Sequence, residues 1–173
     1  MLLIDADGQA SARRWARRAA KRGQPVPFDV EFLPTKDLVD DIDDLEQGRD
    51  LVVIDVGPGN ADIMLAAMAV ADVVVIPANA KPDDLEQAFE AVQACVRLDR
   101  KHLVLLSRVK TAERQSVAIG REFFGSHGVP VLRTVVFDLV AFSDAFGKGT
   151  VEPGLYDEVL KELEEVCGVQ VQA

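Results

Sequence analysis

The sequence predicts an α/β fold in which a doubly wound, mostly parallel sheet is flanked by helices. Short apolar runs rich in Val, Ile and Leu recur along the chain, a pattern typical of strands covered on both faces. Segments with apolar residues at helical spacing separate these runs, so strands and helices alternate as in βαβ units. With 173 residues and 49% hydrophobic composition, the chain is long enough for one sizeable core. We therefore expect a single domain over residues 1–173.

The first predicted strand ends in two aspartates. Leu2–Ile4 is apolar, and Asp5 and Asp7 follow it directly. Ser11 is the expected N-cap of a helix that continues to about Arg22.

This first helix carries a strongly basic face. Its few apolar residues are alanines and Trp15, so we expect a narrow packed stripe and a wide solvated face. Such a face is either simply solvated or contacts DNA, an acidic partner or phosphate. The net charge of −10 disfavours nonspecific nucleic-acid binding by the chain as a whole. The candidates for DNA or partner contact are Arg13, Arg14, Arg17 and Arg18.

The remaining elements continue the alternation, with glycine and proline marking many of their ends. We expect strands over 26–33, 51–56, 72–77, 102–107 and 130–136, and helices over 36–47, 62–71, 82–99, 112–124, 138–146 and 155–166. The acids of the 36–47 helix indicate a solvated face, because the segment lacks the glycine and the final glutamate of a calcium loop.

A third aspartate follows a second strand in the same way. The strand over 51–56 contains Asp55 near its end and leads into a glycine-rich loop that allows close backbone approach to a ligand. Since the carboxyl ends of parallel strands meet at one edge, we expect Asp5, Asp7 and Asp55 around one crevice. Together they favour a magnesium and phosphate site. The alternative is that these acids form turns or cap helices, as Asp often does after strands.

Composition excludes several other classes of protein. Cys95 and Cys167 are far apart and predict free thiols, and His102 and His127 are the only histidines, which disfavours zinc sites and Ser-His hydrolases. The chain contains neither a long uncharged apolar run nor a secretory signal pattern. We expect a cytoplasmic protein without membrane contact.

Eight blocks along nearly the whole chain resemble, in order, the ParA superfamily of deviant-Walker ATPases (ParA/MinD). Among its members the small ParF-like plasmid partition proteins are the most similar. The blocks are Ile4–Gln9, Trp15, Val53–Gly59, Ala71–Pro77, Lys81–Leu85, Ser107–Lys110, Arg133–Thr134 and Ala141–Phe142.

This resemblance implies a P-loop NTPase-like fold and a set of site residues. Asp7 corresponds to the acid that positions or activates the attacking water, and Asp5 to the acid that supports the magnesium shell. Asp55 corresponds to the Walker B aspartate, which holds magnesium through water. Ser107 and Arg108 correspond to a loop that lies against the nucleotide base. The implied cofactors are ATP and Mg²⁺, with Asp5 and Asp55 as metal residues.

The resemblance also implies a role. Proteins of this family bind ATP, dimerise across it, and in that state bind DNA nonspecifically or polymerise. A small ParB- or ParG-like partner stimulates hydrolysis. The chain is thus expected to act in plasmid or chromosome segregation or in cargo positioning, and to associate with the nucleoid if it binds DNA.

The family's phosphate-binding loop, Gly-Lys-Gly-Gly-x-Gly-Lys-Thr, does not occur within these 173 residues. Relative to the family, the first strand, this Walker A loop and the first helix would precede Met1. We expect negligible ATPase activity from the chain by itself, because the amides and lysines that stabilise the transition state are not in it. We also expect a homo-oligomer, since uncovered central strands expose an apolar patch. Two interpretations remain: an ATPase whose Walker A segment lies upstream, and a non-catalytic scaffold that self-associates without hydrolysing ATP.

Overall fold

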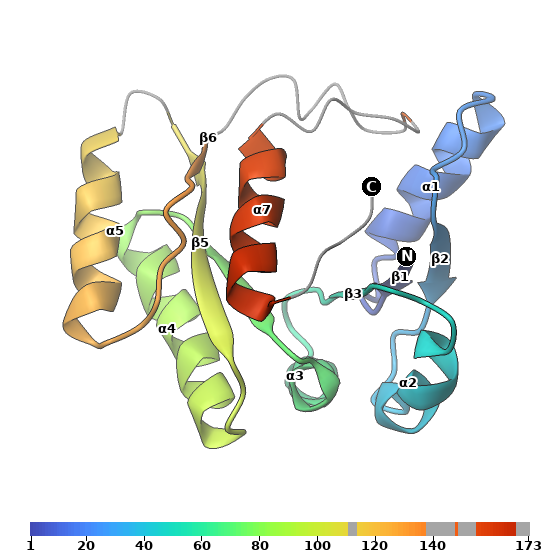
Figure 1. The fold of residues 1–173 in the computed structure, drawn as a ribbon, viewed down its shortest axis with the longest axis horizontal. Helices are drawn as coiled ribbons and strands as arrows, with labels where there is room; N and C mark the ends of the chain where they lie inside the picture. Colours follow the sequence, from blue (N-terminus) through green and yellow to red (C-terminus); the bar gives the residue numbers. More distant parts are fainter. Residues whose placement is uncertain (111–113, 138–147, 149–154, 169–173) are drawn as a thin grey trace. The chain divides into compact units, whose positions relative to one another are not determined.

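The computed structural model describes residues 1–110, 114–137, 148 and 155–168 (Figure 1). These residues form two compact units, which are described separately. The first contains Met1–Val70 and Lys148, and the second contains the described residues of 71–137 and 155–168. Each unit is a parallel three-stranded sheet with helices packed on it, so the predicted α/β class is confirmed. The single domain expected over 1–173 stays a prediction.

The sheet of the first unit has the order β2-β1-β3. Its strands are β1 (Leu2–Asp5), β2 (Asp29–Phe32) and β3 (Val52–Asp55). The central strand β1 pairs in parallel with both neighbours, which places Asp5 opposite Phe32 on one side and opposite Asp55 on the other. This register brings the ends of β1 and β3 to the same edge of the sheet.

Helices cover the two faces of this sheet differently. Because side chains alternate along a strand, Leu2 and Ile4 point to one face, where they pack with α2 (Leu38–Glu46) and α3 (Ala61–Val70) and are fully buried. The opposite face carries Phe32 and α1 (Ser11–Lys21), whose Arg13 guanidinium lies 5.1 Å from the Phe32 ring centroid. The helices α1 and α2 therefore lie on opposite faces.

The second unit is built around β5 (His102–Val109), between β4 (Val74–Ala78) and β6 (Val136–Phe137). Leu103 and Leu105 pack with Val159 of α7 (Leu155–Cys167). Leu106 points the other way, toward Gly120 of α5 (Arg114–Ser126) beside α4 (Pro82–Arg97). Figure 1 shows α7 on one side of β5 and α4 and α5 on the other. The central strand is thus covered on both faces.

The strand expected over 130–136 is wrong for most of its length. Apart from one bridge at Val131, pairing is confined to β6 at the end of that segment. The reason lies in α7, where the buried carboxylate of Glu162 accepts the backbone N–H groups of Arg133 and Thr134 at 2.5 and 3.0 Å. These two donors are therefore unavailable to a neighbouring strand.

The strand expected to end at Ser107 instead continues to Val109. Its register shifts between these residues, and Arg108 has a φ of 55°, so the chain forms a bulge there. The helix expected over 138–146 lies outside the described residues. Both cysteines are free, as predicted. In the described part of the chain, no helix has the length and apolar character needed to cross a membrane.

Candidate functional site

The side chain of Asp5, at the end of β1, caps the N-terminus of α1. Its side chain is fully buried, its Oδ2 accepts the Arg13 N–H at 2.8 Å, and its Oδ1 accepts the Asp7 N–H at 3.3 Å. Arg13 belongs to the first turn of α1, whose N-cap Ala10 offers no side-chain oxygen. A carboxylate at this position satisfies an orphan amide and complements the helix dipole. The cap expected at Ser11 is therefore wrong, and the residue that replaces it comes from β1.

Asp7 shapes the turn between β1 and α1 and contacts the loop that follows β3. Its Oδ1 accepts the Gln9 N–H at 2.9 Å, and its backbone carbonyl accepts the Ala10 N–H at 2.8 Å. A Cβ built on Gly57 would lie only 2.4 Å from the Asp7 Cγ. The half-buried carboxylate thus lies directly against the Gly57 backbone.

Asp55 completes a cluster of three acids at this edge of the sheet. It is opposite Asp5 in the β1–β3 register and is exposed to solvent. Partial burial of its carboxyl raises its pKa, and the negative charges of Asp5 and Asp7 raise it further. No ion pair within the described residues neutralises these acids. The structure therefore brings together all three aspartates that the sequence placed around one crevice.

The chemistry of this cluster suits a hydrated hard cation, since carboxylates and water are the ligands that Mg²⁺ prefers. Asp55 is exposed and could accept hydrogen bonds from such water, whereas both oxygens of Asp5 already accept backbone N–H groups. Over the described ranges, no group of three or more His, Cys, Asp or Glu side chains is arranged to hold a metal ion. The metal roles of Asp5 and Asp55 stay predictions.

Ser107 and Arg108 lie in the second unit, near the end of β5. Ser107 is buried opposite Val136, whereas the Arg108 side chain is exposed. The Asn79 Nδ2 donates a hydrogen bond to the Arg108 carbonyl at 3.2 Å and so ties the bulge to the loop after β4. Sequence reasoning did not single out Asn79, although a polar residue directly after an apolar parallel strand is the available signal.

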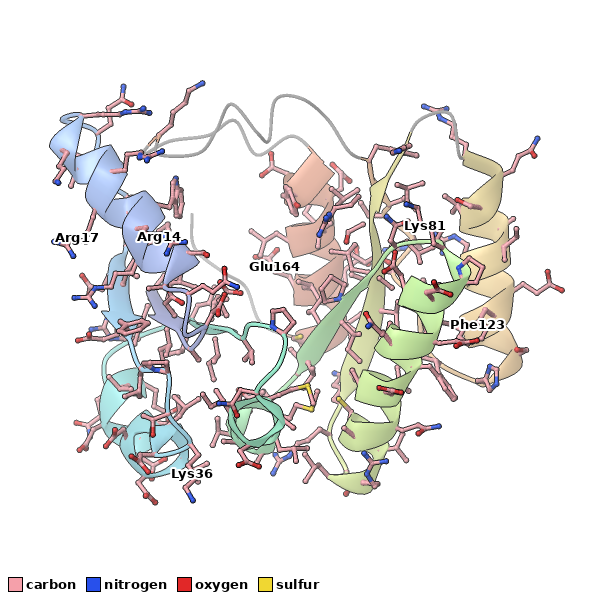
Figure 2. The ribbon with its side chains drawn as sticks, turned by 180° about the vertical axis from the view of Figure 1, so that it is seen from behind. Arg14, Arg17, Lys36, Lys81, Phe123 and Glu164 are labelled. Atoms are coloured by element: carbon pink, nitrogen blue, oxygen red, sulfur yellow. The ribbon has the colours of Figure 1, made fainter. Side chains whose placement is uncertain are left out.

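The basic residues of α1 divide into two groups. Arg13 stacks on Phe32, whereas the outward-facing cations line a surface cavity of about 300 Å³. Figure 2 shows two of them, Arg14 and Arg17, on this helix. The cavity is lined by Arg14, Arg17, Arg18 and Lys21. Three of the four predicted contact residues thus gather there with Lys21, which the prediction omitted.

No protein-family model matches the chain. Over 138 residues it is 30% identical to the "Maintenance of carboxysome distribution protein A" of Gloeobacter kilaueensis. The match covers 79% of this chain and 62% of that protein, so the chain spans less than two thirds of the length of this relative.

Two solved structures share the fold. The structure of apo McdA from Cyanthece has a TM-score of 0.66 at 15% identity, covering 97% of this chain and 84% of that one. A structure described as "Partition Protein" has a TM-score of 0.57 at 14% identity, covering 98% and 64%. The chain thus shares the α/β fold of these two structures, and it is similar in sequence to the carboxysome distribution protein over 79% of its length.

Proposed function

We propose that this chain is a ParA-like positioning or partition protein that self-associates, in an ATP- and Mg²⁺-dependent way when the Walker A segment is present. One observation carries the proposal: Asp5, Asp7 and Asp55 cluster at the carboxyl ends of β1 and β3, beside the Gly57 loop. That edge is where open α/β sheets bind ligands. The similarity to a carboxysome distribution protein favours cargo positioning, with plasmid or chromosome segregation as the related role.

Each acid has a separate proposed task. Asp55 accepts hydrogen bonds from the water shell of Mg²⁺, a task supported by its exposure. Asp7 positions the attacking water, and its contacts with Gln9 and Gly57 hold its carboxylate in place. Asp5 supports the magnesium shell from its buried position behind them. A bound Mg²⁺ supplies positive charge that offsets the repulsion among the acids and the phosphate charge.

In the second unit, we assign Ser107 and Arg108 to the nucleotide base. The bulge leaves the Arg108 side chain exposed while Asn79 anchors its carbonyl, which supports a fixed backbone at this point. An exposed, planar guanidinium can stack on an aromatic base.

The proposed partners are further copies of the chain, a small ParB- or ParG-like protein and nonspecific DNA. Self-association is supported by β3, which pairs only with β1 among the described strands and leaves Val53 40% exposed. Such an edge with an apolar side chain favours association with another surface.

A non-catalytic scaffold is the second candidate function. The observation that favours it is that both oxygens of Asp5 are engaged in capping α1, so this acid has a structural reason to be present. In this role the fold serves self-association without ATP hydrolysis.

The test is calorimetric titration of ATP, with and without Mg²⁺, into the chain and into Asp55→Asn. Asp50→Asn is the matched control, because it removes an exposed carboxylate from the loop before the same strand. If ATP binds, we expect the binding to depend on Mg²⁺, to be abolished by Asp55→Asn and to be preserved by Asp50→Asn. Binding that persists in Asp55→Asn would remove this residue from the site. Self-association without ATP binding would show that association of these 173 residues does not need nucleotide, which is the behaviour expected of the scaffold.

A further inference from the structure

The outward face of α1 carries a regular stripe of positive charge. Arg14, Arg17, Arg18 and Lys21 are spaced i, i+3, i+4, i+7, are all exposed, and line the same cavity of about 300 Å³. Over residues 11–22 the chain contains six basic residues and no acidic one. Neither Arg17 nor Lys21 forms an ion pair with another described residue. Arg17 and Lys21 therefore present cations that no described residue of the first unit neutralises.

The helix α2 and its N-cap carry a stripe of opposite sign with the same spacing. Asp37, Asp40, Asp41 and Asp44 are also placed i, i+3, i+4, i+7, and all are exposed. None of them forms an ion pair in the part of the chain that the structure describes. The two stripes also have similar lengths, because helices of 11 and 9 residues extend about 16 and 14 Å.

One copy of the chain cannot bring the two stripes together. The helix α1 lies on the sheet face that carries Phe32, and α2 lies on the face that carries Leu2 and Ile4. The sheet of the first unit lies between them. Complementary charges that are fixed on opposite faces can be paired only between copies.

We propose that the α1 stripe of one copy docks on the α2 stripe of the next, so that copies associate head to tail. This inference rests on the self-association proposed above and names the surfaces that carry it. The contact joins two different patches of the same chain, so it is heterologous and generates rings or open chains. Since the paired charges are exposed, the contact weakens as ionic strength rises.

The test uses two charge-reversal variants of the full chain without nucleotide. The first carries Arg14→Glu, Arg17→Glu and Lys21→Glu, and the second carries Asp40→Lys, Asp41→Lys and Asp44→Lys. Sedimentation velocity at low and high salt measures the association of each alone and of their equimolar mixture. We expect each variant alone to associate about tenfold more weakly than the unaltered chain or worse. The mixture restores association, because each variant then supplies the stripe that the other one lacks.

A third variant, Glu86→Lys, Glu90→Lys and Glu122→Lys, is the matched control. It raises the net charge by the same amount as the α2 variant, at exposed acids of α4 and α5. It should associate as the unaltered chain does, because both of its stripes are intact. If this control by itself associates as weakly as the α2 variant, the change in net charge rather than the α2 stripe causes the loss, and the proposal is overturned.

Other outcomes separate this inference from the proposed self-association. Association that both reversals leave unchanged overturns the assignment of the two stripes and leaves self-association intact. A chain that stays monomeric at every concentration and salt overturns both. Loss of binding to duplex DNA by the α1 variant, with unchanged self-association, would identify DNA as the occupant of the stripe and contradict the proposal.

Discussion

The carboxylate of Asp7 lies against the backbone of Gly57, so closely that a Cβ at residue 57 would sit 2.4 Å from the Asp7 Cγ. This contact joins the turn after β1 to the loop after β3. A side chain at position 57 would force the Asp7 carboxylate or the loop to shift, because real Cβ atoms do not approach other atoms so closely.

Gly57→Ala should destabilise the chain, because the added methyl group forces the Asp7 carboxylate away from its bond with Gln9 or shifts the loop. We expect a loss of about 1–3 kcal/mol in the free energy of unfolding, measured by urea denaturation. Gly8→Ala is the control, since nothing lies within 4 Å of a Cβ built there. In an Asp7→Ala background the cost of Gly57→Ala should fall. An equal cost in both backgrounds would locate the strain elsewhere.

Asp5→Ala should remove the buried carboxylate that caps the N-terminus of α1. The Arg13 amide loses its acceptor and a buried space is left, so we expect a loss of about 1–3 kcal/mol in unfolding free energy. Hydrogen exchange at the Arg13 amide should accelerate in the same variant. Ser11→Ala should change neither measurement appreciably, because the Ser11 hydroxyl accepts only an exposed, long bond from Arg14. Equal effects of the two substitutions would contradict the cap assigned to Asp5.

The raised pKa of Asp55 predicts a pH dependence of stability. The folded chain holds the Asp55 proton more tightly than the unfolded chain does. Asp55 therefore contributes to the free energy of unfolding at pH below 3.8, its ordinary pKa. This contribution is lost as pH rises through the pKa of the folded state. Asp55→Asn should therefore stabilise the chain more at pH 7 than at pH 4. Urea denaturation at the two pH values measures this difference.

NMR titration of the Asp55 carboxyl provides the second measurement. Asp7→Ala should lower the Asp55 pKa, because it removes one of the two negative charges that raise it. An unchanged titration would show that Asp7 does not contribute to the raised pKa.

Glu162 gives the opposite pH dependence. Burial by itself would raise its pKa, but hydrogen bonds from Arg133 and Thr134 outweigh burial and lower it. Its stabilising contribution is thus present above the ordinary value of 4.5 and is lost as pH falls through the folded pKa. Glu162→Gln should cost about 1–3 kcal/mol at pH 7 and less in acid, measured by urea denaturation. Glu165→Gln removes only an exposed pairing with Arg133 and should cost less than about 1 kcal/mol.

Much of the fold could be predicted because apolar runs mark buried strands. The register that places Asp5 opposite Asp55 follows from two strands that each end in an aspartate. The parts that could not be predicted depend on contacts between distant residues. The N-terminal cap of α1 is Asp5 of β1 rather than Ser11. Glu162, about 30 residues further along the chain, accepts the backbone N–H of Arg133. Neither contact leaves a local pattern.

The site was partly predictable for the same reason. Three acids at strand ends are visible in the sequence, but the buried cap formed by Asp5 and the exposed position of Asp55 are not, because they depend on how α1 packs. The bulge at Arg108 was also missed, since any side chain can occupy it at a modest conformational cost.

The placement of α1 and α2 on opposite faces of one sheet also makes the first unit an electric dipole, with its positive pole at α1 and its negative pole at α2. A chain with a net charge of −10 is repelled by a polyanionic surface at long range. Within about 10 Å, the screening length at 0.1 M salt, the local field acts instead on the nearest pole. Close to such a surface, this unit is therefore turned so that its arginines face the surface and its aspartates face the solvent.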